Sequence, residues 1–179
     1  MARATITKPF VITVFGASGD LAKLKLFPAI YSLVEQKRVT APFYVVGFAR
    51  TKKTNAEFRA EFAASVRAAY GQGVRADALK KLLERVHYFA GQYDAPEDFA
   101  NYQLFLKQIS GVLKKYTHLA YFSVPSSAYK SIIQNLAGRP LVAAEDLRLI
   151  IEKPFGANRA SAEEIFHFAL QNFREEQFY

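Results

Sequence analysis

One glycine-containing turn constrains the fold of this chain more than any other feature. It lies in Val11–Lys23, which reads VITVFGASGDLAK: an apolar run, a turn and the start of a helical pattern. Gly16 lets the chain turn off the strand, Gly19 leaves room for a pyrophosphate at the backbone, and Ala22 allows close helix packing. This order is how a parallel-sheet domain presents backbone N–H groups and a helix N-terminus to a phosphate.

Spacing separates the interpretations of this turn. A Walker A loop requires a second glycine five residues after Gly16, but Leu21 stands there. A nucleophile elbow requires Gly-x-Ser-x-Gly, and Asp20 takes the place of the last glycine. The dinucleotide fingerprint Gly-x-Gly-x-x-Gly is met loosely, because Ser18 replaces its second glycine. The strand before and the helix after favour this fingerprint over an ordinary glycine-rich turn, which stays the alternative. Ser18 and Asp20 are also candidate helix N-terminal residues.

Short apolar runs recur along the chain and are the candidate strands. They are Phe10–Phe15, Phe43–Phe48, Val86–Phe89, Leu119–Val124 and Leu147–Ile151. Most do not alternate, as expected for strands covered on both faces, and helical patterns separate them. The sequence therefore predicts one doubly wound α/β domain over residues 10–179, with a mostly parallel sheet and helices on both faces. Residues 1–9 form an N-terminal extension.

Helical periodicity is clearest in three segments. Phe58, Phe62 and Val66 share one face. A longer stripe consists of Phe99, Tyr102, Leu106, Ile109, Leu113 and Tyr116. Ser161–Glu164 resembles a capping box that opens a last helix through Phe166, Ala169 and Phe173. Pro28 falls inside the first helix, where it should kink the chain or cost roughly 3 kcal/mol.

Composition limits the function classes. The chain has 179 residues, 51% of them hydrophobic, which suits one folded domain. No apolar window is long enough to span a membrane, and the N-terminus lacks a signal-peptide core, so we expect a cytoplasmic protein. The absence of cysteine excludes disulfides and thiolate metal sites, and we expect no metal. The net charge of +8 comes from dispersed basic residues, which favours a ligand with several phosphates over nucleic acid.

The end of the second predicted strand indicates which dinucleotide binds. An NAD-specific domain usually places Asp or Glu there, to accept hydrogen bonds from the ribose hydroxyls. This chain has Arg50, followed by Thr51, Lys52 and Lys53. A guanidinium with neighbouring cations attracts the 2′-phosphate of NADP. The alternative is a solvated basic loop.

Two further strand ends carry candidate site residues. Val124 and Pro125 lead from one strand into a helix start near Tyr129. Glu152 and Lys153 leave the last apolar run, followed by Pro154, Phe155 and Gly156. Ligands of open α/β sheets bind at these carboxyl ends. For the charged pair, a salt-bridged strand terminus is the alternative.

Five motifs in order make the chain resemble the glucose-6-phosphate dehydrogenase family. They are Gly16-Ala-Ser-Gly-Asp-Leu-Ala-Lys23, Gly47-Phe-Ala-Arg50, Ala90-Gly-Gln-Tyr-Asp94, Val124-Pro125 with Tyr129, and Glu152-Lys-Pro-Phe-Gly156. The resemblance implies a Rossmann-like NADP-binding domain of an oxidoreductase of carbohydrate metabolism. That enzyme transfers hydride from C1 of glucose 6-phosphate to NADP and opens the oxidative pentose phosphate pathway.

The resemblance also implies roles for residues. The cofactor site would consist of Gly16, Ala17, Ser18, Gly19, Asp20, Leu21, Ala22, Lys23, Arg50, Tyr93, Val124, Pro125, Tyr129, Glu152 and Lys153. Arg50 would hold the 2′-phosphate. Lys153 would serve catalysis by positioning both the nicotinamide and the sugar phosphate.

The chain ends before other parts of the family pattern. In the family, a segment like Phe173–Tyr179 leads into the substrate-binding motif Arg-Ile-Asp-His-Tyr-Leu-Gly-Lys, and the general-base histidine follows in a large β-rich domain. His87, His118 and His167 match no catalytic position, and we interpret them as structural. We therefore expect a domain that binds NADP without turnover. Glucose 6-phosphate binding and homo-oligomer formation would belong to the parent enzyme, with no nucleic-acid or membrane partner. A free-standing NADP-binding or redox-sensing module, and a basic nucleic-acid-binding domain, are the alternatives.

Overall fold

A five-stranded parallel sheet forms the centre of the molecule. The computed structural model describes residues 4–113, 115–138, 144–153, 156 and 158–179. The strands are β1 (Phe10–Phe15), β2 (Phe43–Ala49), β3 (Val86–Ala90), β4 (Tyr116–Phe122) and β5 (Ala144–Ile151). Their order in the sheet is β3-β2-β1-β4-β5, and all described pairings are parallel. The chain thus extends the sheet first to one side of β1 and then to the other.

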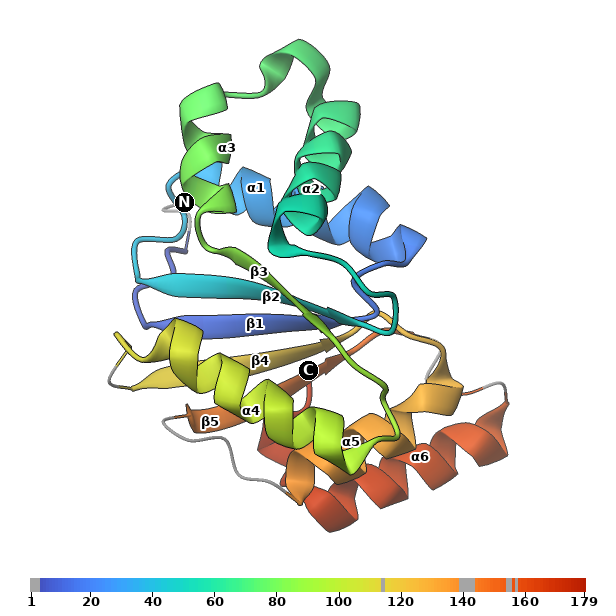
Figure 1. The fold of residues 1–179 in the computed structure, drawn as a ribbon. Coiled ribbons are helices and arrows are strands. Elements are labelled where there is room, and N and C mark those ends of the chain that lie inside the picture. The colour runs from blue at the N-terminus through green and yellow to red at the C-terminus, as the bar shows by residue number, and fades with distance from the viewer. Residues whose placement is uncertain (1–3, 114, 139–143, 154–155, 157) are drawn as a thin grey trace.

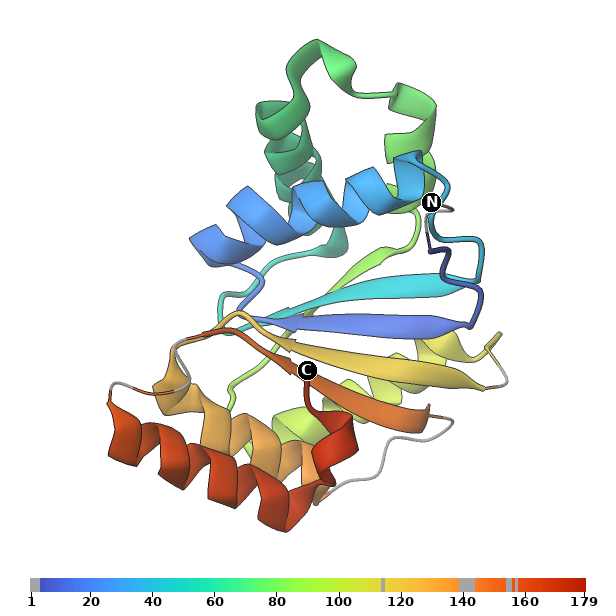
Figure 2. The same ribbon diagram turned by 180° about the vertical axis from the view of Figure 1, so that it is seen from behind.

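Helices cover both faces of the sheet. The described helices are the π-helix η1 (Ala22–Leu26), α1 (Phe27–Glu35), α2 (Asn55–Tyr70), η2 (Gly71–Gly73), α3 (Ala76–Leu83), α4 (Pro96–Ser110), η3 (Ser126–Ala128), α5 (Tyr129–Ala137), α6 (Arg159–Asn172) and η4 (Glu175–Gln177). α1, α2 and α3 lie on one side of the sheet, and α4, α5 and α6 lie on the other (Figures 1 and 2). The predicted doubly wound α/β class is confirmed. Within the described residues, no helix is both long and apolar enough to cross a membrane.

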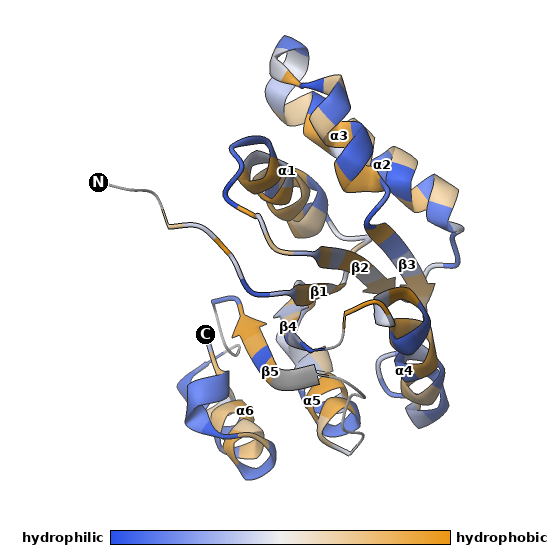
Figure 3. Ribbon diagram, turned by 90° about the vertical axis from the view of Figure 1, so that its left-hand side faces the viewer, coloured by the Kyte–Doolittle hydropathy of each residue, from blue (hydrophilic) through white to orange (hydrophobic). Residues whose placement is uncertain are grey.

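Two hydrophobic clusters, one on each face, hold the layers together. On β1, Val11 and Phe15 pack toward α4 and α5, whereas Phe10 and Val14 pack toward α1 and α2. In Figure 3 the apolar stretches of the helices turn toward the sheet and the polar stretches turn outward. Burying one phenylalanine or valine side chain stabilises the fold by about 1.5–3 kcal/mol, so packing fixes the central strand from both sides. Its carboxyl end, where the glycine turn begins, is therefore rigidly placed.

The boundary between α4 and β4 differs from the sequence prediction. The helical stripe was expected to include Leu113 and Tyr116, but α4 ends at Ser110, and Tyr116 is the first residue of β4. Buried and half-buried residues alternate along this strand. The predicted helix was wrong there because Tyr116 also fits the two-residue period of a strand. Pairing of β4 with β1 and β5 decides between helix and strand. The predicted strand Leu119–Val124 consequently starts too late and ends too late.

Two helix starts also differ in detail. Asn158, rather than Ser161, caps α6: its side chain accepts a hydrogen bond from the Ser161 N–H at 2.9 Å, and Ser161 Oγ accepts one from the Asn158 N–H at 3.0 Å. Ser161 is thus the third residue of α6 and forms the second half of the capping box. In the first helix, Pro28 follows one π-helical segment, in which the Phe27 N–H donates to the Ala22 carbonyl. The chain accommodates Pro28 by this wider turn, because proline has no N–H for the regular bond.

Candidate dinucleotide-binding site

The candidate site lies where the carboxyl ends of the central strands meet. β1 has β2 on one side and β4 on the other, with Phe15 in register with both Phe48 and Phe122. The loops after these strands therefore start level with one another. The Gly16 N–H donates to the Phe48 carbonyl at 2.8 Å, and the Ser123 N–H donates to the Phe15 carbonyl at 2.8 Å. This is the topological switch point at which open α/β sheets bind ligands.

The two glycines of the turn occupy different environments. Gly16 has φ +87°, and a Cβ atom there would lie 2.1 Å from the Ser123 carbonyl oxygen. The fold itself thus requires glycine at this position. The φ of Gly19 is not positive, and a Cβ atom there would have the Gly16 carbonyl oxygen as its nearest neighbour, at 3.2 Å. This is a tight contact rather than an outright clash, so Gly19 is constrained much less than Gly16.

The helix after the turn begins without a side-chain cap. The helix begins at Asp20, before η1, and no described hydrogen bond joins the Ser18 or Asp20 side chain to its first N–H groups, although both residue types could supply one. The expected capping role is thus not observed, and an anion would face no capping side chain at this helix start. Ala17, within the turn, and Ala22, at the start of η1, are buried, whereas Leu21 is exposed. The structure thereby places the small residues against the sheet.

Arg50 leaves the end of β2 beside an aromatic ring. Its guanidinium carbon lies 5.7 Å from the centre of the Tyr93 ring. Both residues line a hollow of about 230 Å³, completed by Gln92, Asp94, Ser127, Ala128 and Ser131. Burial raises the pKa of Tyr93, while the Arg50 charge and the Gly16 backbone act in the opposite direction. The phenol is therefore neutral and lies near both the glycine turn and the exposed cation.

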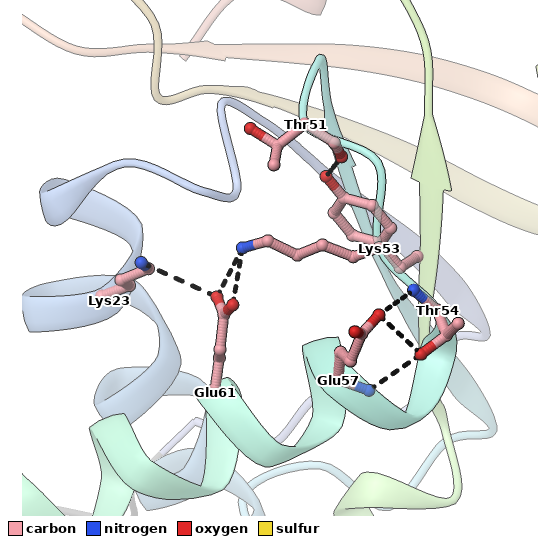
Figure 4. A network of polar contacts seen from close by, with 7 residues as sticks. Lys23, Thr51, Lys53, Thr54, Glu57 and Glu61 are labelled. Carbon is pink, nitrogen blue, oxygen red and sulfur yellow. Dashed lines mark hydrogen bonds and ion pairs between the residues drawn. The ribbon is translucent and has the colours of Figure 1, made fainter.

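The lysines after Arg50 do not form one cationic cluster. Lys53 Nζ lies 2.7 Å from each carboxylate oxygen of Glu61, and its side chain is only 14% exposed. Lys23 Nζ lies 3.7 Å from the same carboxylate (Figure 4). Lys53, one of the cations expected to support Arg50, is thus already paired with the acid on α2. Lys52 is exposed.

Hydrogen bonds anchor the loop that begins at Arg50 to the start of α2. Thr54 and Glu57 form a capping box, with the Glu57 N–H donating to Thr54 Oγ1 at 3.2 Å and the Thr54 N–H donating to Glu57 Oε2 at 2.7 Å (Figure 4). The Tyr88 hydroxyl donates to the Thr51 carbonyl at 2.5 Å. Hydrogen bonds from the backbone and hydroxyl of Thr54 lower the pKa of Glu57. These bonds anchor the backbone at Thr51 and Thr54, in the loop that follows Arg50.

The ends of β4 and β5 supply the other side of the site. The Tyr121 hydroxyl on β4 donates to Glu152 just after β5. Val124 is half-buried, Pro125 is exposed and Tyr129 is buried. Burial and the Glu152 charge raise the pKa of Tyr129. Glu152 thus carries a carboxylate fixed at the strand end, next to the exposed Lys153.

Other sequence predictions fall away from this edge or outside the described residues. Pro154 and Phe155 lie outside them. His118 is buried in the middle of β4 and His87 is the second residue of β3, while His167 lies on α6. No group of three His, Asp or Glu residues in the described segments could hold a metal ion.

Sequence reasoning missed two residues, Glu61 and Tyr121. Glu61 stands eight residues after Lys53, and Glu57 lies between them one helical turn before Glu61. Charge spacing along α2 could have suggested this pairing. Tyr121 has no local signal that links it to Glu152, because the two come from separate strands.

The fold and this edge define a Rossmann-type dinucleotide-binding domain. The family described as glucose-6-phosphate dehydrogenase, NAD binding domain, matches residues 13–179. The chain belongs to the glucose-6-phosphate dehydrogenase family, of which it represents the N-terminal NAD-binding domain.

Individual relatives agree with this assignment. The chain is 31% identical over 178 residues to glucose-6-phosphate 1-dehydrogenase of Schizosaccharomyces pombe, covering 99% of this chain and 36% of that protein. It is 35% identical over 169 residues to the chloroplastic enzyme 1 of Arabidopsis thaliana, covering 94% of this chain and 29% of that protein. A solved glucose-6-phosphate dehydrogenase in complex with glucose 6-phosphate matches with a TM-score of 0.84 and 28% identity, over 100% of this chain and 37% of that one. The chain thus spans about a third of the length of these relatives.

Proposed function

We propose that this chain is the NADP-binding domain of an enzyme that oxidises glucose 6-phosphate at C1. The observation that carries the proposal is the uncapped glycine turn at the switch point, flanked by Arg50 where an NAD-specific domain has a carboxylate. The family membership supports the nicotinamide dinucleotide, and one solved relative was obtained with glucose 6-phosphate. When bound, NADP accepts the hydride that leaves the sugar.

The residues present fit such a cofactor along the whole edge. The turn from Gly16 to Lys23 would receive the pyrophosphate, which could approach the backbone at Gly19 because this residue has no side chain. Arg50 would bind the 2′-phosphate, since a guanidinium forms charge-assisted hydrogen bonds with phosphate oxygens. The neutral ring of Tyr93 offers a stacking surface for the adenine base.

The other half of the cofactor would lie at the ends of β4 and β5. Val124, Pro125 and Tyr129 would wall this part of the site. Glu152, held by Tyr121, would orient the nicotinamide. Lys153, exposed beside it, would position both the nicotinamide and the phosphate of the sugar.

Substrate oxidation itself belongs to the proposed parent enzyme. The proton of the sugar hydroxyl needs a base, and the three histidines of this chain lie away from the edge. The substrate motif, the base and the homo-oligomer contacts would come from the remaining two-thirds of the parent. The cytoplasmic location expected from the sequence stays a prediction, because the matched relatives include chloroplastic enzymes.

Calorimetric titration of the chain with NADP tests the proposal. We expect saturable binding with one dinucleotide per chain. Titration with duplex DNA under the same conditions tests the basic nucleic-acid-binding alternative. Absence of NADP binding by the folded protein would contradict the proposal.

A further inference from the structure

A three-residue charge cluster joins η1, the loop after β2 and α2 beside the proposed 2′-phosphate position. Lys23 comes from η1, Lys53 from the loop after β2 and Glu61 from α2 (Figure 4). Both carboxylate oxygens of Glu61 lie 2.7 Å from Lys53 Nζ, and one lies 3.7 Å from Lys23 Nζ. One carboxylate therefore serves two cations that approach it from separate elements.

The cluster lies next to the proposed phosphate contacts. The Lys23 N–H donates to the Gly19 carbonyl at 3.2 Å, which places Lys23 in the first turn after the glycine loop. Lys53 follows Arg50 by three residues. Because β1 and β2 are paired neighbours, the loops after them lie side by side at one edge. Glu61 thus adds a negative charge beside the cations that a bound phosphate would meet.

The ion pair removes Lys53 from the set of available phosphate ligands. The side chain of Lys53 is 14% exposed, compared with 35% for Lys23 and 34% for Glu61. A lysine held by two carboxylate oxygens must give up that contact before it can bind another anion. Lys23 is held less closely, but its charge is partly balanced by the same carboxylate.

The surrounding loop keeps Lys53 in place whether or not Glu61 is charged. The Thr54 capping box follows it directly, and the Thr51 carbonyl is bonded two residues before it. Neutralising Glu61 would therefore release the ammonium group without releasing the backbone that carries it. The freed group would stay within the loop that also carries Arg50.

We infer that Glu61 is a specificity-determining residue that weakens 2′-phosphate binding and narrows the preference for NADP over NAD. This inference rests on the proposed function. Glu61 competes with the 2′-phosphate for Lys53 and Lys23, and it repels that phosphate directly. NAD carries no 2′-phosphate, so its affinity depends less on this carboxylate.

Glu61→Gln tests the inference, because glutamine keeps the size of the side chain and removes its charge. The dissociation constants of NADP and NAD are measured by calorimetry at low and high salt. We expect the affinity ratio of NADP to NAD to rise about fivefold at low salt, as for loss of one exposed charge near a phosphate dianion. The gain should shrink at high salt, where exposed charges are screened. Glu84→Gln, at the amino-terminal edge before β3, makes the same charge change and should leave the ratio unchanged.

The outcomes separate the two proposals. An unchanged or lower ratio in Glu61→Gln, with NADP binding intact in the unmodified protein, overturns the inference and leaves the proposed function standing. Equal weakening of both dinucleotides together with a lower melting temperature shows a structural role for Glu61 and also overturns it. If the unmodified protein binds neither dinucleotide, the proposed function fails, and the inference fails with it.

Discussion

The α-carbon of Gly16 faces the backbone carbonyl of Ser123, so closely that a Cβ atom at residue 16 would lie 2.1 Å from the carbonyl oxygen. This contact joins the turn after β1 to the end of β4, the two strands that border the switch point. Gly19, three residues later, meets no atom closer than 3.2 Å in the same test. A side chain would therefore clash outright at Gly16 and make only a tight contact at Gly19.

The two glycines should respond differently to substitution. Gly19→Val should abolish NADP binding while the protein still unfolds cooperatively, because the branched side chain fills the proposed pyrophosphate position. Gly16→Ala should lower stability by more than about 1 kcal/mol, since both its φ and the Ser123 contact oppose a side chain. Calorimetry and thermal unfolding measure the two effects. Gly73→Val, at a glycine with open space around it, should change neither. Normal NADP binding by Gly19→Val would show that the turn is wrongly assigned.

Arg50→Ala should remove most of the preference for NADP over NAD. A lost charge-assisted phosphate contact typically costs roughly 1.5–3 kcal/mol, which is about ten- to more than a hundredfold in affinity. The side chain is exposed, so the fold should be unaffected. Lys52→Ala, at a nearby exposed cation, is the matched control and should have a smaller effect. Equal affinities of the unmodified protein for NADP and NAD would refute this prediction.

Tyr121→Phe should weaken binding of the nicotinamide half of the cofactor alone. Burial raises the pKa of Tyr121, so its hydroxyl stays protonated and donates to Glu152. Loss of a hydrogen bond to a charged group costs about 1.5–3 kcal/mol, of which only the part felt by the nicotinamide reaches NADP affinity. Titration with 2′,5′-ADP, which lacks the nicotinamide, should give the same affinity for both proteins. Equal weakening of both ligands would show that Tyr121 acts through the fold instead.

How far the sequence predicts this molecule depends on the range of each interaction. The turn after β1 was predictable because strand, glycines and helix follow one another within one segment. The start of β4 was not, because Tyr116 fits a helical period and a strand period equally well, and pairing with distant strands decides between them. Asn158 can cap α6 because its own backbone is extended, and the residue types around it do not reveal that conformation. The links from Lys53 to Glu61 and from Tyr121 to Glu152 become visible only once the helix and the strands are placed.

Acidification should destabilise the protein through His118. This residue is fully buried, its Nε2 lies 2.9 Å from Thr13 Oγ1, and burial lowers its pKa to about 3. Since the unfolded chain has a histidine pKa near 6.5, it binds the proton more readily than the folded protein does. The contribution of neutral His118 to the free energy of unfolding is therefore complete above pH 6.5. It falls by about 1.4 kcal/mol per pH unit between pH 6.5 and pH 3.

Urea unfolding at pH 7 and pH 5 measures this dependence on His118. The slope between the two pH values should be smaller in His118→Gln than in the unmodified protein, even if the variant is less stable at both. His167→Gln, at an exposed position on α6, should keep the full slope. A slope that His118→Gln leaves unchanged would assign the acid sensitivity to other groups.

The chain of 179 residues should bind NADP without producing NADPH from glucose 6-phosphate. Hydride can leave C1 only as the hydroxyl proton is taken up, and a positioned base commonly contributes about 10²–10⁴-fold in rate. Glu152 lies at the site, but its carboxylate accepts the Tyr121 hydroxyl, and the histidines lie elsewhere in the described fold. Holding the sugar beside the nicotinamide would contribute at least as much, and under the proposed function Lys153 would supply only part of that positioning. Absorbance of reduced nicotinamide with excess substrate measures the rate, beside a protein extended to the full length of the relatives. A rate near that of the extended protein would contradict the prediction, and Glu152→Gln would then show whether this carboxylate is the base.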